Sequence, residues 1–180
     1  MAEQLGTRAN LTVITGDALK LEWHARKVIG NIPYYITSPL IDKALTPPLP
    51  ERVVFLVQAE VADRLAAKPG GKTYGALSVG VQALCRVEQL FRIAPGAFKP
   101  PPKVHSALVR LTPRAEPLVT PDEVARLRAF VTTCFSRRRK QLKNVVPGLD
   151  LQALGFDPTI RPERLPPEAF VRLLRALPSR

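Results

Sequence analysis

Short β-rich runs alternate with helical segments between residues 11 and 112, and this alternation limits most strongly the folds that the chain can adopt. The runs read LTVI, KVIGNI and RVVFLV, and the last continues as QAEVADRLAA, a strand followed by a helix. Two later runs, VEQLFRI and VHSALVRL, flank the turn-rich APGAFKPPPK, which predicts two strands joined by a long loop near the sheet's edge. The pattern favours an open, largely parallel α/β sheet.

Helices alone are expected after that sheet. Apolar side chains recur at helical spacing and form one face of a helix: Val124, Leu127, Phe130, Val131 and Cys134. We expect further helices at about 137–146 and 167–177, the second of them after two prolines. The sequence therefore predicts two parts, a sheet domain over residues 1–113 and a small helical domain over residues 114–180.

The composition is that of a globular chain, with 46% hydrophobic and 23% charged residues among 180. No apolar run approaches the ~20 residues that cross a bilayer, and the opening residues lack the apolar centre of a signal peptide. We therefore expect a cytoplasmic protein. Cys85 and Cys134 stand apart from each other and from any metal-ligand spacing, so we expect two buried thiols and no metal site.

The net charge of +12 points to a polyanionic partner, because a basic surface attracts phosphate groups at long range. Residues 1–90 hold 10 basic and 8 acidic side chains, a net charge of +2, and residues 91–180 hold 17 and 7, a net charge of +10. A solvated basic surface without a partner is the alternative. The concentration of charge in the second half favours nucleic acid.

The segment GNIPYYITSPL places polar groups where a strand should stop. We expect Ile29 and Ile32 to lie in a buried strand that ends before Pro33, because proline cannot donate to a sheet ladder. Asn31 then lies at the carboxyl end of a strand, the edge where open α/β sheets bind ligands. Its amide oxygen and a neighbouring backbone carbonyl are two acceptors for an exocyclic NH₂ group, and Tyr34 adds a planar face.

These groups suit an amino-bearing aromatic base such as adenine. The N6 group of adenine is a poor nucleophile, because its lone pair is delocalised into the ring. Two acceptors that hold its hydrogens can direct the lone pair at an electrophilic methyl group. Catalysis of methyl transfer then depends mainly on how the N6 group is positioned. The base must leave its stack in the nucleic acid, and stacking on an aromatic side chain compensates with ~1–3 kcal/mol of free energy. The alternative is a structural turn with a capping Asn31 and tyrosines in the core.

Six ordered motifs extend over nearly the whole chain: GDAL, NIPYYITSPL, QAEVADRL, YGALSV, FKPPPKVHSALVRL and FSRRRKQLKN. Together they resemble the bacterial 16S rRNA adenine N6,N6-dimethyltransferases, the KsgA/RsmA family. The resemblance implies a partial Rossmann-like class I methyltransferase sheet followed by a small all-helical C-terminal domain. It also implies S-adenosyl-L-methionine as the methyl donor, no metal, 16S rRNA in an immature small ribosomal subunit as the partner, and a monomer.

The resemblance assigns roles to particular residues. Those implied in catalysis are Asn31, Pro33 through its carbonyl, Tyr34 and Phe98, with Tyr34 and Phe98 on opposite faces of the flipped adenine. Those implied in cofactor binding are Asp17, Ala18 and Asn31. Tyr35 is expected only to shape the pocket. Phosphate contact is expected from Arg137, Arg138, Arg139, Lys140 and Lys143, for which a solvated helix face is the alternative.

One departure from the family concerns the cofactor. The first 30 residues contain Gly6, Gly16 and Gly30 without a G-x-G, and only 16 residues precede Asp17, so two strands with their helices do not fit there. We expect the chain to lack the N-terminal part of the methyltransferase domain, to expose strand edges, and to bind the methyl donor weakly or not at all.

Three other functions stay open. A catalytically incompetent RNA-binding ribosome-assembly factor would explain the missing glycine-rich turn, but it has no need of a base pocket. A 23S rRNA adenine methyltransferase shares the N-I-P-Y segment, although YGALSV, FKPPPKV and FSRRRK favour the small subunit. A DNA adenine methyltransferase would use a similar tetrapeptide and is the weakest alternative.

Overall fold

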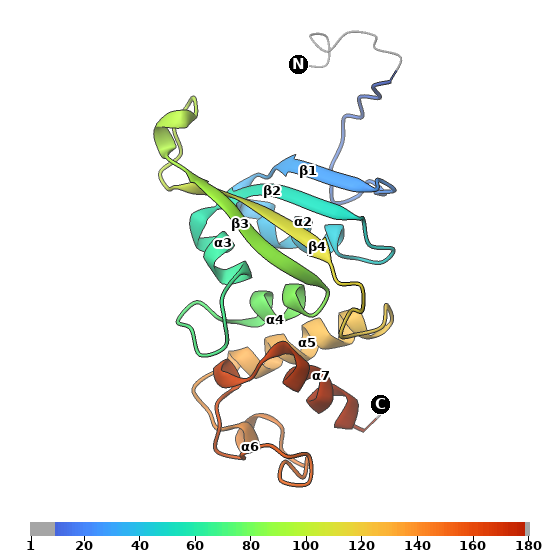
Figure 1. Ribbon diagram of the computed structural model, residues 1–180, viewed down its shortest axis with the longest axis vertical. Coiled ribbons are helices and arrows are strands. Elements are labelled where there is room, and N and C mark those ends of the chain that lie inside the picture. The colour runs from blue at the N-terminus through green and yellow to red at the C-terminus, as the bar shows by residue number, and fades with distance from the viewer. Residues whose placement is uncertain (1–9, 179–180) are drawn as a thin grey trace.

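The computed structural model describes residues 10–178, so the opening segment and its Gly6 lie outside the described residues. Within these residues, four strands, six helices and three 3-10 turns follow one another (Figure 1). In chain order they are β1 Lys27–Asn31, η1 Tyr34–Ile36, α2 Thr37–Ala44, β2 Arg52–Gln58, α3 Ala59–Leu65, α4 Ala76–Gln82, β3 Cys85–Ile93, η2 Pro95–Ala97, β4 Ser106–Pro113, α5 Glu123–Ser136, α6 Leu142–Val145, η3 Pro162–Arg164 and α7 Pro167–Ala176.

The strands form one mixed sheet in the order β1-β2-β4-β3. β1 and β2 run parallel, with Asn31 opposite Leu56, whereas β4 pairs antiparallel with both β2 and β3. The expectation of a largely parallel sheet is therefore wrong for the described strands. The reason is the link between β3 and β4, which is a loop with one short 3-10 turn and contains no crossover helix.

Helices cover one face of this sheet. Alternate residues of β2 and β4 are buried, among them Val53, Phe55 and Val109, and this face packs on α3 and α4. α5 and α7 pack on the far side of α4, and α6 lies at the end of the molecule away from the sheet (Figure 1). The apolar core therefore runs without a break from the sheet through α4 into the last helices.

β1 is an edge strand, and its two faces differ. Gly30 faces the core, where a Cβ atom would lie 3.3 Å from two ring carbons of Phe55, so the strand approaches β2 closely only with glycine there. Ile32 is buried, as expected, but Ile29 is 81% exposed. The expectation that Ile29 is buried is wrong, because no described helix covers the face of β1 to which it belongs.

The segment before β1 contains no strand in the described part, although LTVI was expected to form one. Residues 11–15 have no neighbouring strand with which to pair, and a β-rich run without a partner leaves its backbone groups unpaired. Residues 18–20 form a turn, in which the backbone N–H groups of Lys20 and Leu21 donate to the Asp17 carbonyl. Figure 1 shows this segment leading away from the sheet.

The helical region agrees with the expected pattern in two of its three helices. α5 buries Val124, Leu127, Val131 and Cys134, and α7 covers most of residues 167–177. The expected helix at 137–146 is wrong: residues 137–140 form a turn, and α6 holds four residues. Adjacent positive charges disfavour a helix there, and Gln141 is extended. The proposed boundary at residue 113 stays a prediction, because the core is continuous across it.

Over residues 10–178, none of the helices combines the length and the apolar character needed to cross a membrane.

Candidate functional site

A cavity of about 280 Å³ lies at the carboxyl end of β1. β1 and β2 end at the same edge of the sheet, because they are parallel and in register. The loop between β3 and β4 returns to this edge, and its prolines stand beside the end of β1. The lining comes from both segments: Asn31, Ile32, Pro33, Tyr34, Phe98, Pro100 and Pro102. The structure therefore brings Asn31, Pro33, Tyr34 and Phe98 together, as expected.

The N-I-P-Y segment is shaped by the end of the strand. The Ile32 N–H makes the last bond to β2, donating to the Leu56 carbonyl at 3.2 Å, and the chain turns into η1 at Pro33. The Ile36 N–H donates to the Pro33 carbonyl at 3.1 Å. The Thr37 hydroxyl also donates to the Pro33 carbonyl, at 3.4 Å. Both lone pairs of this carbonyl are therefore approached within the turn, and its expected role as an acceptor for a base requires the longer contact to be given up.

The two aromatic side chains reach the cavity from different elements. Tyr34 is half-buried, and its hydroxyl oxygen lies 2.6 Å from the Ser106 hydroxyl oxygen at the start of β4. Phe98 follows η2, which begins with Pro95. Tyr35, in contrast, is 86% exposed and does not line the cavity, so the expected shaping role has no support here. Sequence reasoning did not include Ser106 in the site.

A second hollow, of about 380 Å³, adjoins the same loop at the end of β2. It is lined by Gln58, Ala59, Glu60, Arg92, Lys103, Val104 and His105. Arg92 forms an ion pair with the Asp63 carboxylate at 2.5 Å. Lys103, the other basic residue in this lining, is exposed and has no ion pair within residues 10–178. The sheet edge therefore carries a base-sized cavity with polar and charged groups beside it.

Asp17 and Ala18 lie outside the cavity. The Asp17 Oδ1 atom accepts a hydrogen bond from the Leu19 N–H at 2.9 Å, and the Ala18 carbonyl accepts one from the Trp23 indole at 3.1 Å. Asp17 is exposed and its Oδ2 atom has no partner among the described residues, so Oδ2 is an available acceptor for an exocyclic amino group. Asn31 is the one expected cofactor residue that lies at the cavity.

The basic cluster after α5 divides into exposed and anchored side chains. Arg137, Arg139, Lys140 and Lys143 are exposed. Arg138 is half-buried, and its Nη2 atom donates to the Gly71 and Lys72 carbonyls at 3.3 and 3.2 Å. It therefore fastens the α3–α4 loop to the end of α5, which the sequence pattern did not indicate.

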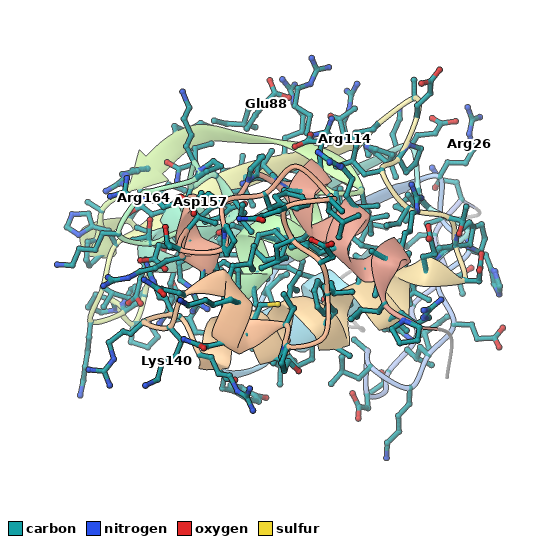
Figure 2. The ribbon with its side chains drawn as sticks, turned by 90° about the horizontal axis from the view of Figure 1, so that it is seen from below. Arg26, Glu88, Arg114, Lys140, Asp157 and Arg164 are labelled. Carbon is teal, nitrogen blue, oxygen red and sulfur yellow. The ribbon has the colours of Figure 1, made fainter. Side chains whose placement is uncertain are left out.

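Other basic side chains come close to this cluster through that loop. The Gly70 N–H donates to the Glu163 carbonyl at 2.6 Å, and a Cβ atom on Gly70 would meet Arg164, so η3 packs on the same loop. Figure 2 shows Lys140 and Arg164 on one side of the molecule and Arg26 on the other. The α3–α4 loop and η3 thus add exposed Lys68, Lys72, Arg161 and Arg164 to the basic surface, none of which sequence reasoning assigned.

The titratable groups with shifted pKa values lie outside the cavity. Hydrogen bonds from Arg175 and from Thr120 lower the pKa of Glu123 to about 2. Burial raises the pKa of Cys85 and of Cys134 to about 12, and both thiols are free and buried, as expected. Among residues 10–178 there is no group of three or more His, Cys, Asp or Glu side chains that could hold a metal ion.

Solved structures place this sheet and its helices in a known class. A dimethyladenosine transferase from Plasmodium falciparum superposes with a TM-score of 0.82 at 29% identity, covering 94% of this chain and 73% of that one. The 23S rRNA methyltransferase ErmE superposes with a TM-score of 0.72 at 29% identity, covering 97% and 75%. The fold is therefore the Rossmann-like class I methyltransferase fold in part, followed by helices.

Sequence comparison narrows the class to a family. Residues 1–174 match the family described as ribosomal RNA adenine dimethylase. The ribosomal RNA small subunit methyltransferase A of Pseudomonas aeruginosa is 45% identical over 186 residues, covering 97% of this chain and 69% of that protein. The protein of the same name from Hahella chejuensis is 47% identical over 173 residues, covering 89% and 63%. The chain belongs to the ribosomal RNA adenine dimethylase family and spans about two thirds of the length of these relatives.

Proposed function

We propose that the protein transfers methyl groups from S-adenosyl-L-methionine to adenosines of 16S rRNA, making N6,N6-dimethyladenosine during ribosome biogenesis. Family membership and the names of the relatives support the reaction class. The observation that carries the proposal is the cavity at the end of β1, whose lining includes Asn31 and the aromatic residues Tyr34 and Phe98. A cavity of about 280 Å³ is large enough for one purine base.

The proposed mechanism follows from the groups at that cavity. Tyr34 and Phe98 stack on the two faces of an adenine that has left its helix. The Asn31 amide oxygen and a backbone carbonyl of the same segment accept the N6 hydrogens, which turns the nitrogen lone pair outward. The bound cofactor supplies an electrophilic methyl group. Held by these acceptors, the N6 lone pair would face that methyl group, the N–C bond would form at the expense of the cofactor's S–C bond, and N6 would give one proton to water.

A second transfer to the same nitrogen replaces its remaining hydrogen. The first product keeps one N–H, which the Asn31 amide can still accept, so the same geometry serves both transfers. Asp17 and Ala18 are proposed to hold the adenosyl part of the cofactor. These residues fit the cofactor only in part. The Asp17 Oδ2 atom accepts no hydrogen bond from the described residues and could accept one from the cofactor, but Asp17 does not line the cavity that contains Asn31.

Residues 114–180 are proposed to dock the RNA as a helical domain, with residues 1–113 carrying the methyl transfer. Arg137, Arg139, Lys140 and Lys143 are exposed and stand within seven positions, so they can each meet a phosphate. Among the described residues Arg138 donates only from Nη2, and its remaining donors are proposed to contact the RNA backbone. The partner is an immature small ribosomal subunit.

The test is methyl transfer to small ribosomal subunits that lack dimethyladenosine. The 180-residue chain and a version extended upstream in its reading frame are each incubated with the subunits and the methyl donor, and the rRNA is analysed by mass spectrometry. N6,N6-dimethyladenosine in 16S rRNA is the expected product of the extended version, and the 180-residue chain should yield little or none. Product in 23S rRNA alone would replace the proposal by large-subunit methylation.

A ribosome-assembly factor without methyl transfer is the second candidate. The position of Asp17 and Ala18 outside the Asn31 cavity favours it, because a working site must bring the methyl group to that cavity. This candidate predicts salt-sensitive binding of both versions to immature subunits with no methylated adenosine in either rRNA.

A further inference from the structure

Ser106 is a buried hydroxyl at the junction of three strands. It opens β4, pairs with Gln58 of β2 and with Ile93 of β3, and has no exposed surface. Within residues 10–178 its hydroxyl has one hydrogen-bond partner, the Tyr34 hydroxyl at 2.6 Å. A buried hydroxyl at such a position costs free energy unless it is hydrogen-bonded, and alanine would fill the space without that cost. A role for the hydroxyl beyond packing is therefore expected.

The contact holds the Tyr34 ring at its outer end. The other end of the residue is held by its backbone, because the Thr37 hydroxyl donates to the Tyr34 carbonyl at 3.1 Å. Thr37 is itself buried, with 3% of its surface exposed. The hydroxyl oxygen lies on the long axis of the ring, so contacts at the hydroxyl and at the backbone fix the direction of that axis. The phenol then cannot swing away from the cavity about its first side-chain torsion.

The same contact joins the two walls of the cavity. Tyr34 stands on the N-I-P-Y wall, and Ser106 ends the loop that carries Phe98. A base stacked between two rings needs about 7 Å between their planes, two van der Waals contacts of about 3.5 Å each. A tyrosine free to pivot would lose that spacing for part of the time.

We propose that Ser106 is a positioning residue that fixes the Tyr34 ring for stacking on the flipped adenine. The inference rests on the proposed function, since it assigns the cavity to a base. Ser106 itself touches neither the base nor the reacting atoms. It acts through the Tyr34 hydroxyl. Ser106 belongs to β4, a strand to which the sequence analysis assigned no site residue.

The direction of the hydrogen bond follows from burial. The Ser106 proton needs an acceptor, and the Tyr34 oxygen is the one within reach, so Ser106 donates. The half-buried Tyr34 then turns its own proton toward the open side of the cavity. Removing the Tyr34 hydroxyl leaves a buried donor without a partner, whereas removing the Ser106 hydroxyl leaves a phenol that water can reach.

The test uses the 180-residue chain and a single-stranded oligouridine with one 2-aminopurine, a fluorescent adenine analogue that is quenched by stacking. The variants are Ser106→Ala, Tyr34→Phe and the double variant. Ser78→Ala is the matched control, because Ser78 is equally buried and its hydroxyl donates to the Arg64 carbonyl outside the cavity. The sequence has three tyrosines, so ¹³C-labelled tyrosine also reports the Tyr34 ring directly by NMR.

Ser106→Ala should weaken oligonucleotide binding about fivefold, raise the emission of the bound probe, and shift the Tyr34 ring signals in the NMR spectrum. Tyr34→Phe should give a similar loss, and the double variant no further loss, because both act on one contact. Ser78→Ala should bind as the wild type does. Wild-type binding and ring signals in Ser106→Ala, or a double variant that loses the product of both single effects, would overturn the positioning role.

The outcome for the wild type separates this inference from the proposed function. A wild-type chain that binds the oligonucleotide but leaves the probe unquenched would show that no base stacks in the cavity, and the proposed function and the inference would fail together. A quenched wild-type complex with an equally quenched Ser106→Ala complex would remove the role of Ser106 alone.

Discussion

Replacing Arg138 by alanine should destabilise the protein although the residue belongs to a basic surface cluster. The half-buried guanidinium donates from Nη2 to the Gly71 and Lys72 carbonyls at 3.3 and 3.2 Å, and this contact fastens the α3–α4 loop to the end of α5. Hydrogen bonds from a charged donor contribute about 1.5–3 kcal/mol each, and long, partly solvated ones less. We therefore expect the free energy of unfolding to fall by about 1–2 kcal/mol.

Urea denaturation followed by circular dichroism measures this loss, with Arg139→Ala as the matched control. Arg139 is exposed, so its replacement should leave the free energy of unfolding within about 0.5 kcal/mol of the wild type. The same variant should lower the slope of log K against log salt for RNA binding by about 1, the release of one phosphate contact. Equal stability for Arg138→Ala and the wild type would refute the anchoring role.

Three further perturbations follow from particular contacts. Phe98→Ala should weaken binding of an unpaired adenosine in a short RNA about 5- to 150-fold, the equivalent of ~1–3 kcal/mol of stacking, as measured by fluorescence anisotropy; unchanged affinity would place the base elsewhere. Glu123 has its pKa lowered to about 2 from 4.5 by Arg175, so its contribution to stability is complete above pH 4.5 and is lost as the pH falls toward 2. Glu123→Gln should therefore cost about 1–2 kcal/mol at pH 7 after allowance for solvent screening, and urea denaturation should show the two proteins converging near pH 2–3. Gly70 has a φ of +82°, where alanine is strained, so Gly70→Ala should lower the thermal midpoint while Gly96→Ala, with open space around it and no positive φ, leaves it unchanged.

The elements of the fold could largely be predicted, but their arrangement could not. Short β-rich runs predicted β2, β3 and β4 close to their observed bounds, because β-branched and other apolar residues mark a strand within its own segment. The position of β4 between β2 and β3 depends on pairings across long stretches of chain, which no local pattern encodes. The antiparallel direction could have been deduced, since a loop of 12 residues without a helix does not form a parallel crossover.

The candidate site was predictable where a motif lies in one segment. Asn31 and Tyr34 follow the end of a strand, and Phe98 belongs to a proline-rich loop that returns to the same edge. Ser106 was missed because its hydroxyl partner lies 72 positions away in sequence. Arg138 was placed with the exposed basic residues because its carbonyl partners lie in the α3–α4 loop. Sequence patterns therefore did not predict hydrogen bonds between single polar groups that lie far apart in the chain.

We propose that Asn31 acts on the reacting nitrogen and not on RNA docking. The most direct measurement is the single-turnover methylation rate together with RNA affinity, for the wild type and Asn31→Ala of the version extended upstream. We expect the Asn31→Ala rate to be about 10²- to 10³-fold lower than that of the wild type, as for the loss of one placed hydrogen-bonding group, with RNA affinity within about threefold. Equal losses of rate and affinity would contradict it, and would make Asn31 a binding residue of the RNA surface.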